Sequence, residues 1–368
     1  MSAKRELRIG MIGHRFMGRV HSHAYRNVGT FFDVPFTPIL QVIAGTNIQS
    51  VEQAAHTLGF KEAESDWHRL IERNDIDVID IAAPNDMHAA IAIAASQAGK
   101  AVLCEKPLAI NLSEAQTMYR TVVAHDTAHM ICHNYRFVPA IQLAHDLIQE
   151  GRLGQIRQIR AHYLQDWMLD QPHRSSWRFS KSRSGSGALG DLGAHSIDLA
   201  RFLVGEFSEV VSLLHQGIRD EVDSVDDSCM FLANFQSGAT GIFEATRMSP
   251  GNRNSNRIEI DGDKGSLRWD LESMNLLQLY LHEDDEKMQG FRTIHCTSPV
   301  HPYASHYWPA GHSIGYETTF ITLISQFLIG ISHGRCQSPD FYDGYRNQLI
   351  LDAVERSAVH HSWMTVPL

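Results

Sequence analysis

Three residues in the stretch 187–203 (GALGDLGAHSIDLARFL) have types and spacings that suit proton transfer. Asp191, His195 and Asp198 lie four and three positions apart, so a helix would place them on one face. Most other side chains here are apolar, which predicts a largely buried helix, and buried ionisable groups need partners. Either Asp191 and His195 satisfy each other in a core, or Asp191 caps the helix, or Asp191 orients His195 as a general base.

Lys106 is a second candidate, because it precedes Pro107 at the end of the strand-like run 101–105 (AVLCE). A lysine in such a place is most often simply solvated. Pro107 fixes its own φ and restricts the preceding residue to extended backbone, so the Lys106 side chain has a defined direction. The residue is therefore either a surface lysine or a cation held at a strand end.

A glycine-containing turn follows the first apolar run of the chain. Residues 7–12 (LRIGMI) predict a buried parallel strand, and the turn 13–18 (GHRFMG) leads into a helical stretch. This order is typical of dinucleotide binding, in which N–H groups at the helix N-terminus face a pyrophosphate. Arg15 takes the place of the middle glycine, so either its guanidinium lies against the phosphates or the turn opens. The candidate cofactor contacts here are Gly13, Arg15, Phe16, Met17 and Gly18.

Thr46 and Asn47 follow the second predicted strand, 39–44, where an acidic residue usually binds the adenosine ribose. Without a carboxylate, a 2′-phosphate is not repelled, and without a nearby Arg or Lys it is not attracted. Both NAD and NADP are therefore compatible with the sequence, and the missing cation favours NAD.

Apolar runs alternate with helical stretches through the first third of the chain, with further strands predicted at 77–83, 101–105 and 129–132. This alternation predicts an α/β fold in which residues 1–132 form a Rossmann domain with a doubly wound parallel sheet. Residues just past the carboxyl ends of such strands face the ligand crevice. These residues are Pro84, Asn85, Glu105, Lys106 and Pro107.

The pattern changes from residue 133. A long alternating strand at 155–167 is followed, after the His195 helix, by successive strands without helices between them. Their ranges are 209–214, 228–235, 240–246, 257–261, 266–269 and 276–281. We therefore expect residues 133–368 to form an α+β domain with a large, mostly antiparallel sheet. One face should pack on the His195 helix and on helices 318–331 and 345–361, and the other face should be open.

Composition narrows the function. The 368 residues are 43% hydrophobic, enough for two domains with large cores, and the net charge of −10 with no basic block disfavours nucleic acid and anionic membranes. The N-terminus resembles no secretory signal, and no stretch reaches about 18 apolar residues. The five scattered cysteines predict no disulfide framework and suit a reducing cytoplasm. The histidines lack Cys or Glu at ligand spacing, so no metal is expected.

Together, these motifs resemble the Gfo/Idh/MocA family of NAD(P)-dependent oxidoreductases, such as inositol dehydrogenases. The matching motifs are 13–18, Pro84-Asn85 with His88, Glu105-Lys106-Pro107 and Asp191…His195…Asp198. The resemblance extends over nearly the whole chain. Within the family, it is greatest to sugar dehydrogenases that act at carbon 3, through the stretches 16–25, 133–139, 163–167, 176–179 and 301–315.

The resemblance implies a role for each matching residue. Lys106 would lie near the nicotinamide and the reacting hydroxyl, and His195 would be the general base with Asp191 as its partner and a substrate contact. Asn85 and His88 would contact the cofactor near its nicotinamide. The open sheet face would meet another subunit, giving a homodimer or homotetramer.

Polar side chains beside aromatic rings suit a polyhydroxylated ring, although the same residues could simply pack in strands and loops. The candidate substrate contacts are Lys106, Tyr135, Arg136, Tyr163, Gln165, Asp166, Trp167, Arg178, Asp191 and His195. The polar and aromatic stretch 168–186 is expected to form a loop over the pocket.

The resulting hypothesis is oxidation of a secondary hydroxyl of a pyranose-like sugar or polyol (levoglucosan, a glucoside or an inositol), with carbon 3 as the expected position. A neutral histidine can accept the hydroxyl proton near pH 7, and Lys106 would stabilise charge on the oxygen. Two alternatives stay open: a glycoside-cleaving enzyme of the same family that recycles NAD, and a non-enzymatic regulator that senses sugars or nucleotides.

Overall fold

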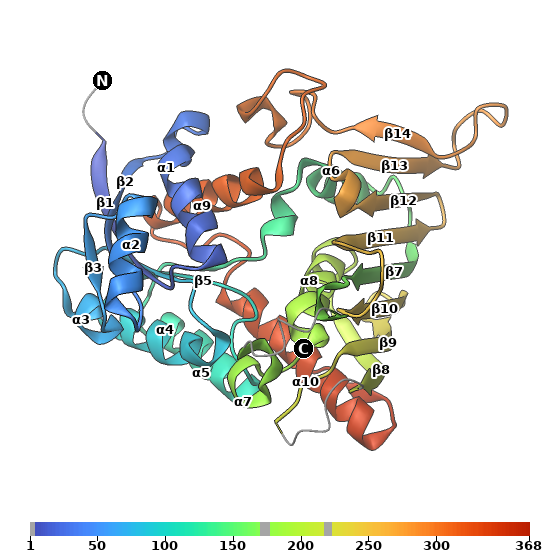
Figure 1. Cartoon of the computed structure of the whole chain (residues 1–368). Coiled ribbons are helices and arrows are strands. Elements are labelled where there is room, and N and C mark those ends of the chain that lie inside the picture. The colour runs from blue at the N-terminus through green and yellow to red at the C-terminus, as the bar shows by residue number, and fades with distance from the viewer. Residues whose placement is uncertain (1–3, 170–176, 217–222) are drawn as a thin grey trace. The chain divides into compact units, whose positions relative to one another are not determined.

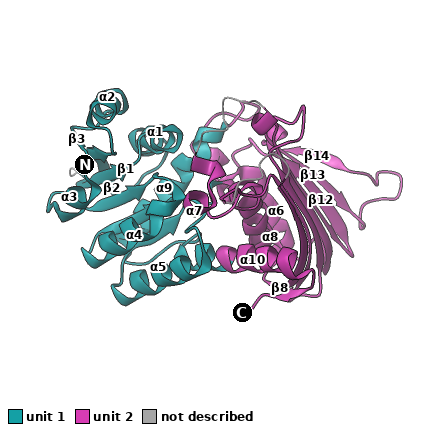
Figure 2. Ribbon diagram, turned by 60° about the horizontal axis from the view of Figure 1, so that its bottom comes forward, with its two compact units in different colours: residues 1–134, 315–346 teal, residues 135–314, 347–368 magenta. Residues whose placement is uncertain are grey.

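The computed structural model describes residues 4–169, 177–216 and 223–368, coloured along the chain in Figure 1. The chain forms two compact units, which Figure 2 distinguishes by colour. The first unit comprises residues 1–134 and 315–346, and the second comprises 135–314 and 347–368. The sequence analysis placed everything after residue 132 in one second domain, whereas the segment 315–346 belongs to the first unit.

The first unit contains a six-stranded parallel sheet with the order β3-β2-β1-β4-β5-β6. Its strands are β1 (Arg5–Ile12), β2 (Phe36–Ala44), β3 (Glu62–Glu64), β4 (Val78–Ile81), β5 (Ala101–Cys104) and β6 (His129–Ile131). The predicted doubly wound sheet is confirmed. The strand order reverses between β1 and β4, and ligands of such sheets bind at the carboxyl ends beside this point.

The helices of the first unit follow the strands. They are α1 (Phe16–Phe31), α2 (Ile48–Leu58), α3 (Trp67–Glu72), α4 (His88–Gln97), α5 (Leu112–Ala124) and α9 (Tyr316–Ser332). The prediction that 318–331 packs on the second sheet is wrong, because α9 lies along α1 in the first unit. Apolar residues surround most of α9, and such a pattern predicts that a helix is buried without indicating which surface buries it.

The second unit contains a nine-stranded sheet with the order β14-β13-β12-β11-β7-β10-β9-β8-β15. Its strands are β7 (Ile156–Leu164), β8 (Phe207–His215), β9 (Ser228–Phe235), β10 (Thr240–Thr246), β11 (Ser255–Gly262), β12 (Gly265–Asp270), β13 (Leu276–Leu281), β14 (Arg292–His295) and β15 (Met364–Thr365). β7 and β10 pair in parallel, and the other pairs are antiparallel. The predicted, mostly antiparallel sheet is confirmed.

Helices cover one face of this sheet. They include α6 (Pro139–Gln149), α8 (Ala194–Leu203) and α10 (Phe341–His360), which lie on the same side of the strands in Figure 2. The short α7 (Lys181–Ser184) and a π-helical turn, Leu189–Gly193, precede α8. Ser212 of β8 donates its hydroxyl to the Val354 carbonyl of α10 at 2.6 Å, which fixes α10 on the sheet. Among the described helices, none is long and apolar enough to cross a membrane.

The opposite face of the sheet, called the open face below, has an apolar half and a charged half. Leu213, Met230, Leu232 and Ile242 on β8–β10 are between 44% and 62% exposed, and the strand register makes them neighbours. On β7, β11 and β12 the exposed residues instead form ion pairs, including Arg160–Asp261 at 2.6 Å and Arg268–Glu259 at 2.9 Å.

Candidate active site

The glycine turn after β1 has the shape that a dinucleotide requires. Gly13 has a φ of +106°, and a Cβ there would overlap the carbonyl oxygen of Ala82, while a Cβ at Gly18 would overlap the carbonyl oxygen of Gly13. Helix α1 begins at Phe16, and in the part of the chain that the structure describes no side chain caps this end. The first N–H groups of α1 can therefore bind a pyrophosphate, so the turn fits NAD.

Arg15 occupies the middle position of this turn with a φ of −82°, so the left-handed φ that favours glycine is not needed there. Its side chain is exposed, as is that of Phe16, and Met17 is half-buried. The turn is therefore accessible from solvent at these positions. The predicted contacts of Arg15, Phe16 and Met17 with the cofactor stay predictions.

The end of β2 shows what replaces the usual acidic residue. Asn47 is the N-cap of α2, and its side-chain oxygen accepts a hydrogen bond from the Ser50 N–H at 3.0 Å. The His14 imidazole lies against Gly45 and is 2.8 Å from the Ser50 hydroxyl. Burial and the neighbouring Arg15 lower the pKa of His14. Thr46 is exposed, and His14 is a further cofactor-side candidate that the sequence analysis missed.

His88 connects the two strand ends that carry the predicted nicotinamide contacts. Its Nδ1 is 3.0 Å from the carbonyl oxygen of Pro107, and its Nε2 is 3.0 Å from that of Ala83. The ring is fully buried, which lowers its pKa. Asn85 starts the short turn just before α4 and is also buried, after the half-buried Pro84. The geometry makes His88 a bridge between segments, and its contact with the cofactor stays a prediction.

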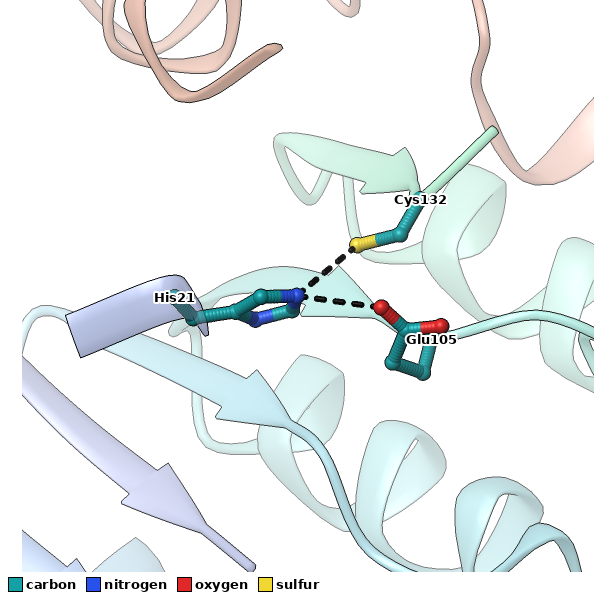
Figure 3. A group of neighbouring side chains, drawn as sticks. All are labelled: His21, Glu105 and Cys132. Carbon is teal, nitrogen blue, oxygen red and sulfur yellow. Dashed lines mark hydrogen bonds and ion pairs between the residues drawn. The ribbon is translucent and has the colours of Figure 1, made fainter. Parts of the chain in front are cut away.

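A buried polar cluster is joined to Lys106 through the adjacent residue Glu105. His21 on α1 is 2.8 Å from Asp80 of β4 through Nδ1 and 3.0 Å from Glu105 through Nε2, and the Cys132 sulfur is 3.8 Å from Nε2. Figure 3 shows His21, Glu105 and Cys132 converging at the ends of β5 and β6. Glu105 also accepts the Lys106 N–H at 3.1 Å, and Lys106 itself is half-buried. The sequence analysis predicted Glu105 and Lys106 but missed His21 and Asp80.

In the second unit, Asp191 and His195 lie on consecutive turns of one helical segment, Asp191 in the π-helical turn and His195 in α8. The interpretation that Asp191 caps this segment is wrong. Asp226 does so, because its two carboxylate oxygens accept the N–H groups of Gly187 and Leu189 at 2.6 and 2.7 Å. Burial raises the pKa of Asp226. Asp191 is therefore not the cap of this segment, and its side chain is 29% exposed.

His195 packs against two tyrosine rings. The imidazole centroid is 4.7 Å from that of Tyr135 and 5.8 Å from that of Tyr163, and the residue is only 7% exposed. One turn further along α8, Asp198 forms a buried ion pair with Arg136, with oxygen–nitrogen distances of 2.6 and 2.9 Å. This ion pair holds the segment carrying Tyr135 against α8. Arg136 was predicted as a substrate contact; its guanidinium binds Asp198, and its contact with a substrate stays a prediction.

A chain of neutral hydrogen bonds continues from these tyrosines. Tyr135 and Tyr163 join their hydroxyls at 3.0 Å, and Tyr163 donates to the side-chain oxygen of Asn254 at 2.7 Å. Gln165 donates to the same oxygen at 2.7 Å and accepts the Trp167 indole N–H at 2.7 Å. The structure thus brings four predicted substrate contacts together and adds Asn254. The sequence feature that could have indicated Asn254 is a polar side chain just before a strand.

Arg247 is a buried cation that sequence reasoning missed. It is fully buried, with Nη1 3.7 Å from the Asp191 carboxylate and Nη2 3.3 Å from the Asp226 carbonyl oxygen. Its guanidinium lies 5.3 Å from the Trp167 ring centroid and 5.7 Å from that of Phe179. Burial lowers the pKa of Arg247, although Asp191 and Asp226 oppose this. The sequence feature that could have indicated Arg247 is an arginine directly after an apolar strand.

Two predicted contacts lie at the edge of this group. Asp166 is 3.4 Å from the exposed Arg253, and Arg178 stacks on Trp177 at 4.8 Å. The described parts of the predicted loop 168–186 contain short helical turns and α7. Residues 170–176 of that loop lie outside the described residues.

Comparison with known proteins now identifies the family. Residues 7–133 match the model of an oxidoreductase family with an NAD-binding Rossmann fold, and residues 141–268 match the GFO/IDH/MocA C-terminal domain. The chain therefore belongs to the Gfo/Idh/MocA family and is an NAD-dependent oxidoreductase. The predicted family and fold are confirmed, and so is NAD as a cofactor.

Individual relatives are similar over the whole chain. Levoglucosan dehydrogenase of Pseudarthrobacter phenanthrenivorans is 42% identical, with 98% of each chain covered. A solved structure of levoglucosan dehydrogenase in complex with NADH and levoglucosan has a TM-score of 0.96 and 43% identity, covering 99% of this chain and all of that one. An oxidoreductase domain protein from Kribbella flavida gives the same TM-score at 44% identity, with the same coverage.

Proposed function

We propose that this enzyme oxidises one secondary hydroxyl of a pyranose-type sugar or polyol to a ketone, with levoglucosan as the first substrate to test. The observation that carries the proposal is the surroundings of His195. A buried imidazole packs against two neighbouring tyrosines that begin a chain of neutral hydrogen-bonding groups. The similarity to levoglucosan dehydrogenase over the whole chain supports the same substrate class.

The chemistry needs a proton acceptor. A secondary alcohol becomes a ketone when its O–H proton leaves for a base and its C–H hydrogen leaves with both electrons as hydride. When bound, NAD supplies the acceptor for that hydride. His195 takes the proton at its imidazole, and Asp191, one turn away on the same helical segment, favours the charged ring that results. Tyr135 and Tyr163 restrict the orientation of the ring.

Lys106 supplies the positive charge for the reacting oxygen. Negative charge builds on that oxygen as the proton leaves, and an ammonium group held nearby stabilises it. The Lys106 backbone is held on one side by the Glu105 carboxylate, and Pro107 is held by His88. These contacts fix the position of the backbone from which the Lys106 side chain extends.

Neutral groups of the second unit would recognise the other hydroxyls of the ring. Tyr163, Gln165 and Trp167 offer hydroxyl, amide and indole groups in one connected chain. Neutral donors and acceptors with aromatic faces suit an uncharged sugar better than a sugar phosphate, which would select for cations. We propose carbon 3 as the oxidised position, on the similarity to sugar 3-dehydrogenases.

The test is the appearance of NADH, followed by its near-ultraviolet absorbance, with purified enzyme and a panel of levoglucosan, glucose, glucosides and inositols. NAD and NADP are compared in parallel, and the product of the best substrate is examined by ¹³C NMR. Net NADH formation with a ketone at carbon 3 is expected. Glycoside cleavage without net NADH, or a ketone at another carbon, would contradict the proposal.

We also propose that the open face joins two copies of the chain in a homodimer or homotetramer. Its apolar half places Leu213, Met230, Leu232 and Ile242 side by side and exposed, which is unusual on a monomer surface. Light scattering coupled to gel filtration should show an oligomer that Leu232→Asp dissociates. Val123→Asp, at another exposed apolar site on α5 (59% exposed, against 47% for Leu232), is the control and should leave the mass unchanged.

A further inference from the structure

His21 has no assigned role, yet it is the centre of the buried cluster in Figure 3. The ring is completely buried, as is Asp80, and Glu105 is 6% exposed. Nδ1 lies 2.8 and 3.1 Å from the two oxygens of Asp80, and Nε2 lies 3.0 Å from Glu105. Each nitrogen therefore faces a buried carboxyl group.

These distances determine the protonation of the ring. A carboxylate is only an acceptor, so a hydrogen bond from each nitrogen requires a proton on each, and the ring is an imidazolium. Burial disfavours that charge, but Asp80 raises the pKa of His21 well above its usual value. Burial likewise acts against the Glu105 carboxylate, but His21 lowers the pKa of Glu105. One positive charge thus stabilises two buried negative ones.

The cluster reaches Lys106 through Glu105. One Glu105 oxygen accepts the His21 N–H, and the other accepts the Lys106 backbone N–H at 3.1 Å. With both oxygens engaged, the carboxylate cannot rotate, and its position determines where the Lys106 backbone lies. A misplacement of about 1 Å in a reacting group can reduce a rate about 100-fold.

We propose that His21 is a positioning residue for Lys106: shared between Asp80 and Glu105, it holds the Glu105 carboxylate on the lysine backbone. This rests on the proposed function, because Lys106 matters only if it acts on the substrate. His21, Glu105 and Cys132 also have potential ligand atoms within 4.8 Å of one another. Both nitrogens of His21 are already directed at carboxylates, so a proton rather than a metal ion is the bridging charge.

The kinetic test compares His21→Gln with His23→Gln, the same substitution on the half-buried neighbour in α1. His21→Gln leaves two buried carboxylates without their cation, so kcat should fall about 10- to 100-fold while KM for the sugar and the NADH dissociation constant stay unchanged. The double variant Asp80→Asn/His21→Gln removes the excess charge and should recover much of kcat. His23→Gln should match the wild type.

A structural test is independent of turnover. In ¹⁵N-histidine-labelled protein at about pH 8.5, ordinary histidines are neutral, and one ring with both nitrogens protonated should remain. Its signals should disappear in His21→Gln. A neutral His21, stoichiometric bound metal, or an unchanged kcat in a turning-over His21→Gln variant would overturn the inference. Absence of any sugar oxidation by the wild type would overturn the proposed function instead, and the NMR result would still stand.

Discussion

Around Lys106 the first unit gathers buried charges, whereas around His195 the second unit gathers aromatic rings and neutral hydrogen bonds. His21 lies between the carboxyl groups of Asp80 and Glu105 and bonds to both of them. Tyr135 and Tyr163 pack against His195, and their hydroxyls lead to Asn254 through neutral hydrogen bonds. The buried cations of the second unit are paired beside this chain: Arg247 lies against Asp191 and the Trp167 ring, and Arg136 binds Asp198.

The difference follows from what each region has to do. A charge cluster holds one backbone position firmly, and its strength depends on pH because every member can titrate. Neutral hydroxyl and amide groups do not titrate in the physiological range, and they can exchange partners with a sugar. We therefore expect the first region to respond to charge changes and the second to the loss of single hydroxyls.

The largest effect is expected at His195. His195→Asn keeps a polar side chain but removes the proton acceptor, so kcat should fall about 100- to 10,000-fold. The dissociation constant for NADH, measured by fluorescence titration, should not change, because the glycine turn lies in the other unit. His282→Asn, in an exposed turn, is the control. A variant that retains wild-type kcat would refute the assignment of the base.

Arg247 tests how far the second region depends on charge. Arg247→Met leaves Asp191 and the buried Asp226 without their cation, and breaking such a buried arrangement costs about 3–5 kcal/mol of unfolding free energy. Arg247→Lys keeps the charge and should be less destabilised. The measurement is urea unfolding followed by circular dichroism. Equal stability of the Met variant and the wild type would show that neutral contacts alone support this region.

Tyr163 tests the neutral chain itself. Tyr163→Phe removes the hydroxyl that joins Tyr135 to Asn254, and losing hydrogen bonds of this kind costs about 1–1.5 kcal/mol. We expect KM for the sugar to rise about tenfold and the pH profile of kcat to keep its shape. Tyr280→Phe on β13, whose ring packs on Phe291, serves as the control. An altered pH profile would place Tyr163 in proton transfer.

The smallest effect is a pH dependence of stability in the charge cluster. Because the pKa of His21 is raised, its contribution is complete below about pH 6.5 and declines as pH rises through the folded value. Because the pKa of Glu105 is lowered, its contribution is present above its ordinary value of 4.5 and is lost as pH falls through the folded one.

The measurement is the difference in unfolding free energy between the wild type and His21→Gln from about pH 5 to pH 10. The difference should shrink toward alkaline pH by less than about 1.4 kcal/mol per pH unit, the limit for one proton. A difference that grows toward alkaline pH would mean that His21 is buried as a neutral ring.

Several parts of the fold were not predictable from local patterns. β3 has the sequence EAE, which has no strand character, and forms only because β2 offers a free edge. The capping of the His195 segment comes from Asp226, which is 35 residues or more away in the chain from the groups it binds. The position of α9 along α1 is a matter of tertiary packing, because a helix that is apolar on most sides could be buried by several surfaces.

By itself, the sequence determined the alternation of strands and helices, the glycine turn, the placement of Lys106 at a strand end and the helical spacing of Asp191 and His195. These features follow from local periodicity and backbone restrictions, which act over a few residues. Only the tertiary structure decided that His21 binds Asp80 and Glu105, that Asp198 binds Arg136, and that Arg247 lies behind Asp191. Such pairings depend on distant segments meeting in a buried place, where an ionised side chain must find an opposite charge, and spacing along the chain carries no record of that partner.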